Sequence, residues 1–291
     1  MDTNQETGQD KVGEALKAQR FHMLEDIAKE LKGNIVFPTY FDADLHLRKA
    51  LQDPDLPTAR LASIVSLEPL IATKLIKLAN SVLYNPQCIL VHSLPAAITR
   101  IGFNQVRATS LAIAMDQMLR CKEMAVFGDL TRALWIHSLK SAAAAHVLAS
   151  NYTRINPDEA LLAGLVHDLG AFYMIYRAAQ YPELRSRPDS VKYLIVQWHE
   201  SIGVTLLNAL GLPENIVEAT IDHDQPQPLP ETLRTLKDIV YIANILAGAR
   251  FEWMLQDLEM DAANPKQVHS TYGELLPQIE AEAKEMQAVF A

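Results

Sequence analysis

Apolar residues recur at steps of three and four along nearly the whole chain, and this helical spacing most restricts what the chain can fold into. No segment shows the alternation of apolar and polar residues that a half-buried strand requires. Hydrophobic residues make up 49% of the 291 residues, which is enough to give many helices a common core. The sequence therefore predicts an all-α protein. One apolar helical stripe runs through Leu67, Ile71, Leu75 and Leu78.

Capping and stop signals divide the pattern into separate helices. Asn156 is a helix cap followed by Pro157 at the first helical position, and we expect this helix to stop near Gly170. A second stop is expected at Gly102. Residues 131–150 contain neither Gly nor Pro and are rich in Ala and Leu, which predicts a long buried helix.

Charge and cysteine content exclude several classes of protein. Asp and Glu outnumber Lys and Arg by 35 to 26, so the mean field of the chain repels nucleic acid and anionic membrane surfaces. Cys88 and Cys121 show no paired spacing, and no apolar run reaches the roughly 20 residues of a membrane span. We therefore expect a cytoplasmic protein that binds neither nucleic acid nor membrane.

Five polar residues of the C-terminal half lie near or inside apolar helical segments. Imidazoles and a carboxylate from different helices can together hold a divalent transition metal. Any one histidine taken alone is more often a core or surface residue satisfied by a hydrogen bond. His146 is such a case, because it lies nine residues after His137 and so faces the opposite side of the same helix. The candidate metal ligands are His137, His167, Asp168, His199 and His223.

The order of these motifs resembles a known superfamily. His137 followed by the adjacent His167 and Asp168 resembles the HD superfamily of metal-dependent phosphohydrolases, named for that dipeptide. "HESIG" and "DHD" resemble the later histidine motifs of its HD-GYP branch, which hydrolyses cyclic dinucleotides. From about residue 35 to about residue 250, the chain resembles the HDOD family closely, including its "SLEP" turn, its "LANS" helix end and its "AITRIGF" helix.

The HDOD resemblance implies an organisation and a role. The fold would be an N-terminal helical bundle packed on an HD-like helical bundle. HDOD domains mostly lack demonstrated activity and occur in bacterial signalling proteins, so the resemblance implies a stand-alone regulatory protein. It would bind a signalling partner, with a divalent metal (iron, manganese, nickel or zinc), a nucleotide ligand and a homodimer as further expectations. The implied divisions are an extension (1–34), an HDOD domain (35–255) with halves 35–128 and 129–255, and an amphipathic tail (256–291).

Departures from the superfamily's pattern bear on catalysis. The late metal-binding aspartate corresponds to Asn244, and the Lys that commonly follows the dipeptide corresponds to Ala171. Asp222 and Asp224 flank His223 and would repel an anionic substrate. These features favour a regulatory protein without catalysis. The alternative is a metal-dependent phosphohydrolase that acts on a cyclic nucleotide or another phosphodiester, with the metal activating water.

Overall fold

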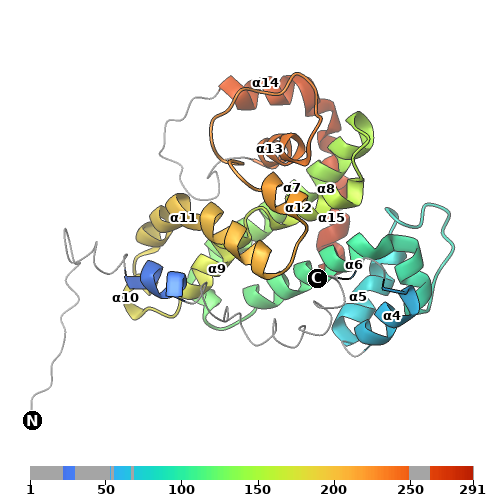
Figure 1. Cartoon of the computed structure of the whole chain (residues 1–291), viewed down its shortest axis with the longest axis horizontal. Coiled ribbons are helices and arrows are strands. Elements are labelled where there is room, and N and C mark those ends of the chain that lie inside the picture. The colour runs from blue at the N-terminus through green and yellow to red at the C-terminus, as the bar shows by residue number, and fades with distance from the viewer. Residues whose placement is uncertain (1–21, 30–52, 54–55, 67–68, 249–262, 291) are drawn as a thin grey trace, which may run out of the picture.

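The computed structural model describes residues 22–29, 53, 56–66, 69–248 and 263–290, and every regular element among them is a helix (Figure 1). The predicted all-α fold is therefore confirmed. Two 3-10 turns, η1 (Met124–Phe127) and η2 (Gly273–Leu275), accompany the helices. Besides the helical residues 22–29, the helices are α4 (Thr58–Val65), α5 (Pro69–Ala79), α6 (Leu94–Leu119), α7 (Gly128–Tyr152), α8 (Pro157–Val166), α9 (Leu169–Ala178), α10 (Pro182–Arg185), α11 (Pro188–Ala209), α12 (Glu214–Ala219), α13 (Leu236–Leu246), α14 (Ala263–Tyr272) and α15 (Leu276–Phe290).

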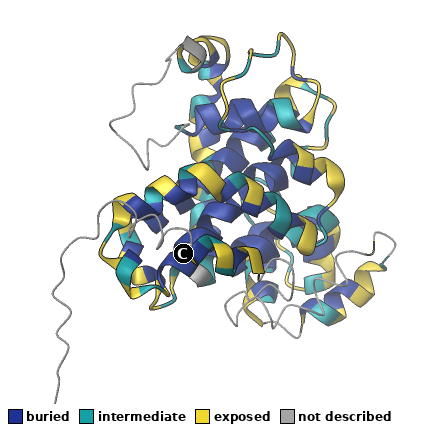
Figure 2. Ribbon diagram, turned by 60° about the vertical axis from the view of Figure 1, so that its left-hand side comes forward, coloured by how far each residue is buried: buried dark blue, intermediate teal, exposed yellow. Residues whose placement is uncertain are grey.

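Helix α7 is the central element of the C-terminal half, and most of its residues are buried. Figure 2 shows that buried residues gather on the helices in the middle of the molecule. It packs against α8, α13 and α15. Small residues allow α8 to come very close: a Cβ atom added at Gly164 would lie 2.6 Å from the backbone oxygen of Ser141 on α7. The predicted buried helix at 131–150 is confirmed, and it extends to Gly128 and Tyr152.

Gly170 has a different role from the predicted helix stop, and that prediction is wrong. Helix α8 already ends at Val166, and α9 starts at Leu169 directly after the His167–Asp168 pair. Gly170 lies inside α9, where an added Cβ atom would stand only 1.9 Å from the backbone oxygen of His199 on α11. The glycine is needed because the backbones of α9 and α11 touch at this point.

Helices α4, α5 and α6 form the N-terminal bundle, which packs on the second bundle through contacts of α6 with α7 and α8. The predicted stop at Gly102 is confirmed: its φ of 77° and ψ of 168° break α6 into two consecutive helical pieces. This left-handed φ favours glycine because it has no Cβ atom. Asn80 ties the start of the following loop to its end, since its side chain both donates to and accepts from the backbone of Val91.

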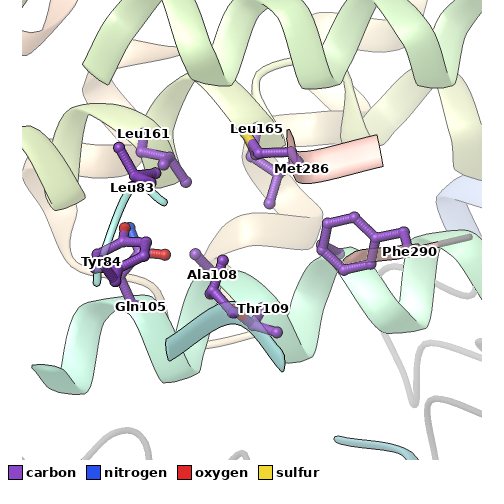
Figure 3. A pocket seen from close by; sticks show the side chains of 11 residues that line it. Leu83, Tyr84, Gln105, Ala108, Thr109, Leu161, Leu165, Met286 and Phe290 are labelled. Carbon is purple, nitrogen blue, oxygen red and sulfur yellow. The ribbon is translucent and has the colours of Figure 1, made fainter. Parts of the chain in front are cut away.

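The C-terminal residues pack onto their own chain. Helix α15 contacts both α7 and α5, so it joins the two bundles. Its Met286 and Phe290 line a small apolar pocket together with Leu161 and Leu165 of α8 and Thr109 of α6 (Figure 3). Residues 256–291 are expected to form an amphipathic tail. In the described part, 263–290, the apolar residues of α15 pack against helices of the same chain.

Several expectations fall partly outside the described residues. Of the expected extension 1–34, only residues 22–29 are described; they are helical, with Met23 and Ile27 buried. His46 lies outside the described residues. None of the helices described is both long and apolar enough to cross a membrane.

We predict that Gly170→Ala lowers the free energy of unfolding by at least about 2 kcal/mol, because the new methyl group must push α9 and α11 apart. Gly203→Ala on α11 is the matched control. Its Cβ atom would meet Gly170 at 3.4 Å, an ordinary contact, and alanine favours the helix. Chemical denaturation followed by circular dichroism measures both variants, and equal stabilities would contradict the backbone contact.

Candidate metal centre

The structure brings all five candidate ligands together in the interior of the second bundle. His137 comes from α7, and His199 comes from α11. His167 and Asp168 form the joint between α8 and α9, and His223 lies in the turn after α12. The five residues are between 1% and 5% exposed. Four separate parts of the chain therefore bring these side chains to one place. Metal binding by these residues stays a prediction.

Asp168 stands between two pairs of imidazoles. Its Oδ2 atom lies 3.6 Å from His137 Nε2 and 3.2 Å from His167 Nε2. Its Oδ1 atom lies 3.6 Å from His199 Nε2 and 3.3 Å from His223 Nε2. Within each pair the two Nε2 atoms are 3.2 Å apart. One carboxylate is thus shared by two sets of donors.

Backbone carbonyls hold three of the imidazoles in the same orientation. The Nδ1 atom of His167 lies 2.8 Å from the oxygen of Gly164, and Nδ1 of His199 lies 2.7 Å from that of Ile195. His223 repeats the pattern with Thr220 at 2.6 Å. Each Nδ1–H donates to its carbonyl, which leaves Nε2 directed at the centre. Such outer contacts fix the tautomer of metal-binding histidines in general.

Asp224 is a sixth member of the centre that the sequence analysis missed. Its Oδ2 atom lies 3.4 Å from His199 Nε2 and 3.7 Å from His223 Nε2. The sequence contained a signal, because His223 and Asp224 repeat the order of His167 and Asp168. Asp224 had been grouped with Asp222 as a source of repulsion for an anionic substrate.

The structure separates the two aspartates. Asp222 has a φ of 59°, a left-handed turn that Asp tolerates, and its half-exposed side chain forms an ion pair of 2.8 Å with Lys237. The side chain of Asp224 is only 12% exposed and faces the imidazoles. The turn thus directs Asp222 outward and Asp224 inward, toward the imidazoles.

Asn244, which occupies the expected position of a late metal ligand, contacts Asp224 instead. Its Nδ2 atom donates to Asp224 Oδ1 at 2.9 Å and to the backbone oxygen of His223 at 3.1 Å. Asp238, six residues earlier on the same helix, caps α13 in a reciprocal pair with Thr235 and takes no part in the centre. Ala171 is completely buried within α9.

Burial and charge act in opposite directions on the two carboxylates. Burial raises the pKa of Asp168, but the neighbouring His167 and His223 outweigh it and hold that pKa well below its ordinary value. Burial likewise raises the pKa of Asp224, while His223 and His199 bring it below its ordinary value. Both carboxylates are therefore ionised at neutral pH.

The pKa values of the imidazoles shift in different directions. Burial lowers the pKa of His137 to about 4, against the opposing charge of Asp168. Burial also lowers the pKa of His223, but the charges of Asp224 and Asp168 exceed this effect and raise it to about 10. The pKa of His199 is raised as well, because Asp224 and Asp168 together outweigh the effect of burial. In the metal-free protein the two carboxylates thus favour protonation of the second imidazole pair.

The donors fit a divalent transition metal. Two overlapping sets each place three ligand atoms within 4.8 Å of one another: His137, His167 and Asp168, and Asp168, His199 and His223. Imidazole nitrogen and carboxylate oxygen suit zinc, iron, manganese or nickel. A cation would also compensate the two buried carboxylates, which are costly unless paired.

The remaining histidines lie elsewhere. His146 pairs with Glu282 of α15 at 2.9 Å, on the opposite side of α7 from His137, as predicted. His22, His92 and His269 are exposed.

A comparison with known protein families matches the family model of the HDOD domain to residues 37–226. A protein of Treponema pallidum (strain Nichols) described as uncharacterized is 24% identical over 220 residues, which cover 69% of this chain and 40% of that protein. The chain therefore spans less than half the length of this relative.

Solved structures share the fold. A candidate metal-dependent phosphohydrolase from Shewanella amazonensis SB2B has a TM-score of 0.71 at 21% identity and covers 94% of this chain and 100% of its own. An HDOD domain protein of unknown function from Geobacter sulfurreducens has a TM-score of 0.59 at 18% identity, with coverages of 92% and 98%. A candidate signal transduction protein from Marinobacter aquaeolei VT8 has a TM-score of 0.53 at 20% identity, with coverages of 93% and 66%. These similarities support the arrangement of two helical bundles.

We predict that Asp168→Ala destabilises the metal-free protein by about 3 kcal/mol or more, because it leaves buried imidazoles without their shared carboxylate. Added metal should raise the melting temperature of the wild type much more than that of the variant. Thermal melts with and without manganese test this, with Asp222→Asn as the exposed control. A variant that melts like the wild type in both conditions would refute the central role of Asp168.

The raised pKa of His223, about 10, predicts that the metal-free protein loses stability as pH rises, whereas the stabilisation gained from metal increases. The stabilisation from protonated His223 is complete below the unfolded pKa of about 6.5 and is lost as pH rises through about 10. Metal competes with that proton, so stabilisation by metal should grow over the same range. Melting temperatures between pH 6.5 and 10, with and without metal, measure both trends. In His223→Gln the metal-free trend should flatten; an equally steep trend in this variant would contradict the assignment.

Proposed function

The chain belongs to the HDOD family, and from this premise we propose that it is a regulatory protein whose buried His/Asp centre binds a divalent metal without hydrolysing a phosphoester. The observation that carries the proposal is the burial of the centre. Its five predicted ligands are at most 5% exposed, and helices of the second bundle enclose them. A hydrolytic metal needs an open position that a substrate phosphoryl group can reach.

The surroundings of the centre also support a binding role. Phosphoryl transfer depends on cations placed around the transferred group. The superfamily's Lys position is Ala171, which is fully buried in α9 and surrounded by core side chains. The contacts of Asp168 in the centre are to imidazoles. When bound, a divalent ion would supply positive charge there, while the four histidines and Asp168 would hold it.

The role proposed for the whole protein is signal transduction. The similarity in fold to a candidate signal transduction protein supports it. We propose a bacterial signalling protein as the partner, and a nucleotide as a second ligand. The state of the metal centre would be what the partner recognises, because the centre connects α7, α9 and α11 of the second bundle.

One observation favours a second candidate function, a metal-dependent phosphohydrolase. Asp168 is shared by two donor sets, an arrangement that suits two metal ions bridged by one carboxylate. Asp224 also supplies a second carboxylate, although the expected position for one is occupied by Asn244. This candidate requires that the centre open to admit a phosphoester.

We predict that the purified protein does not hydrolyse cyclic dinucleotides or a generic phosphodiester at an enzyme-like rate. The enclosed ligands and the apolar Ala171 leave no route for charge stabilisation in the transition state. Turnover should be measured with excess manganese, iron and nickel under reducing conditions, beside His167→Ala. An active HD-GYP enzyme assayed in parallel serves as the positive control. Metal-dependent turnover that disappears in His167→Ala would overturn the proposal in favour of the hydrolase.

A further inference from the structure

We propose that Asp224 is the second carboxylate ligand of the metal centre and that Asn244 is the residue that positions it. This inference rests on the proposed metal-binding function. The four-residue group of Asp224, His199, His223 and Asp168 would form one metal position, and Asn244 would act through Asp224 without touching the ion.

The geometry of Asp224 fits a ligand. Its Oδ2 atom approaches both imidazoles of the second pair, at 3.4 Å from His199 Nε2 and 3.7 Å from His223 Nε2. Asp168 Oδ1 reaches the same two nitrogens from another element, at 3.6 and 3.3 Å. Two nitrogens and two carboxylate oxygens from four side chains therefore point at one region, with the Nδ1 atoms of both imidazoles bound to backbone carbonyls. Four such donors are a common coordination set for a divalent transition metal.

Asn244 explains why Oδ2, and not Oδ1, faces the imidazoles. Its Nδ2 atom donates to Asp224 Oδ1 at 2.9 Å and also to the backbone oxygen of His223. The two bonds fix the carboxylate against the turn that carries His223. An aspartate at position 244 would put a second carboxylate beside Oδ1, where the two negative charges would repel each other. Asn at 244 is thus matched to Asp at 224.

The additional carboxylate of Asp224 makes the two donor sets unequal. The set of His137 and His167 has only a share of Asp168, whereas the set of His199 and His223 has that share and Asp224 as well. A divalent cation is compensated better where more carboxylate charge is available. The His199–His223 position should therefore bind metal more tightly and fill first.

Titration with cobalt(II) tests the proposal, because its visible absorption reports the number and type of ligands. The full-length protein is freed of metal, titrated, and compared with Asp224→Asn, Asn244→Leu and the control Asp222→Asn. Asn244→Leu should weaken the tightest site about 10- to 100-fold, as loss of an outer partner does. Asp224→Asn should weaken it at least as much and change the absorption spectrum, while Asp222→Asn should bind like the wild type.

The exchange variant Asp224→Asn/Asn244→Asp separates position from charge. It keeps the net charge and allows a side-chain hydrogen bond between the same two residues, so it also serves if Asp224→Asn alone fails to fold. If the exchange variant binds cobalt more weakly at the tightest site than the wild type does, Asp224 is supported as a ligand. Cobalt affinity equal to that of the wild type would overturn this role. If Asp224→Asn binds cobalt with the affinity and absorption spectrum of the wild type, Asp224 is not a ligand, while the proposed metal-binding function stands. A wild-type protein that binds no cobalt would overturn the proposed metal-binding function itself.

Discussion

Asp168 imposes the constraint on which the second bundle depends. A carboxylate that is 2% exposed must be compensated by positive charge or hydrogen-bond donors, because an unpaired buried charge is strongly destabilising. Its two oxygens meet this need in opposite directions, toward one imidazole pair each. The imidazoles come from α7, α11, the α8–α9 joint and the turn after α12. These elements must therefore keep their relative positions for the charge to stay compensated.

Two backbone contacts hold that arrangement in place. Gly164 brings α8 against Ser141, one turn beyond His137 on α7, and the oxygen of Gly164 binds Nδ1 of His167. Gly170 brings α9 against the backbone oxygen of His199 itself. Each glycine lies within three residues of the His167–Asp168 pair. Close helix packing and the geometry of the centre are thus set by the same short segment.

The sequence indicated most of the fold and part of the centre, and the differences have physical reasons. Helical spacing and helix caps are local properties, so the long buried helix and the break at Gly102 could be predicted. The role of Gly170 could not, because a glycine near the end of an apolar stretch is typical of a stop, whereas its contact with His199 is made across the fold. Asp224 and Asp222 have the same local composition around His223, and only the backbone of the turn shows which of them faces inward.

A centre built from distant segments links metal binding to folding. The ligands are separated along the chain by whole helices, so the unfolded chain cannot present them together. A metal that binds only the folded state stabilises it in proportion to the logarithm of its concentration over its dissociation constant. In the metal-free state, the raised pKa values of His199 and His223 favour protons on the second imidazole pair, which would supply part of the same compensation. Metal and protons therefore compete for one buried negative site, and the helices that carry its ligands stay compensated with either of them.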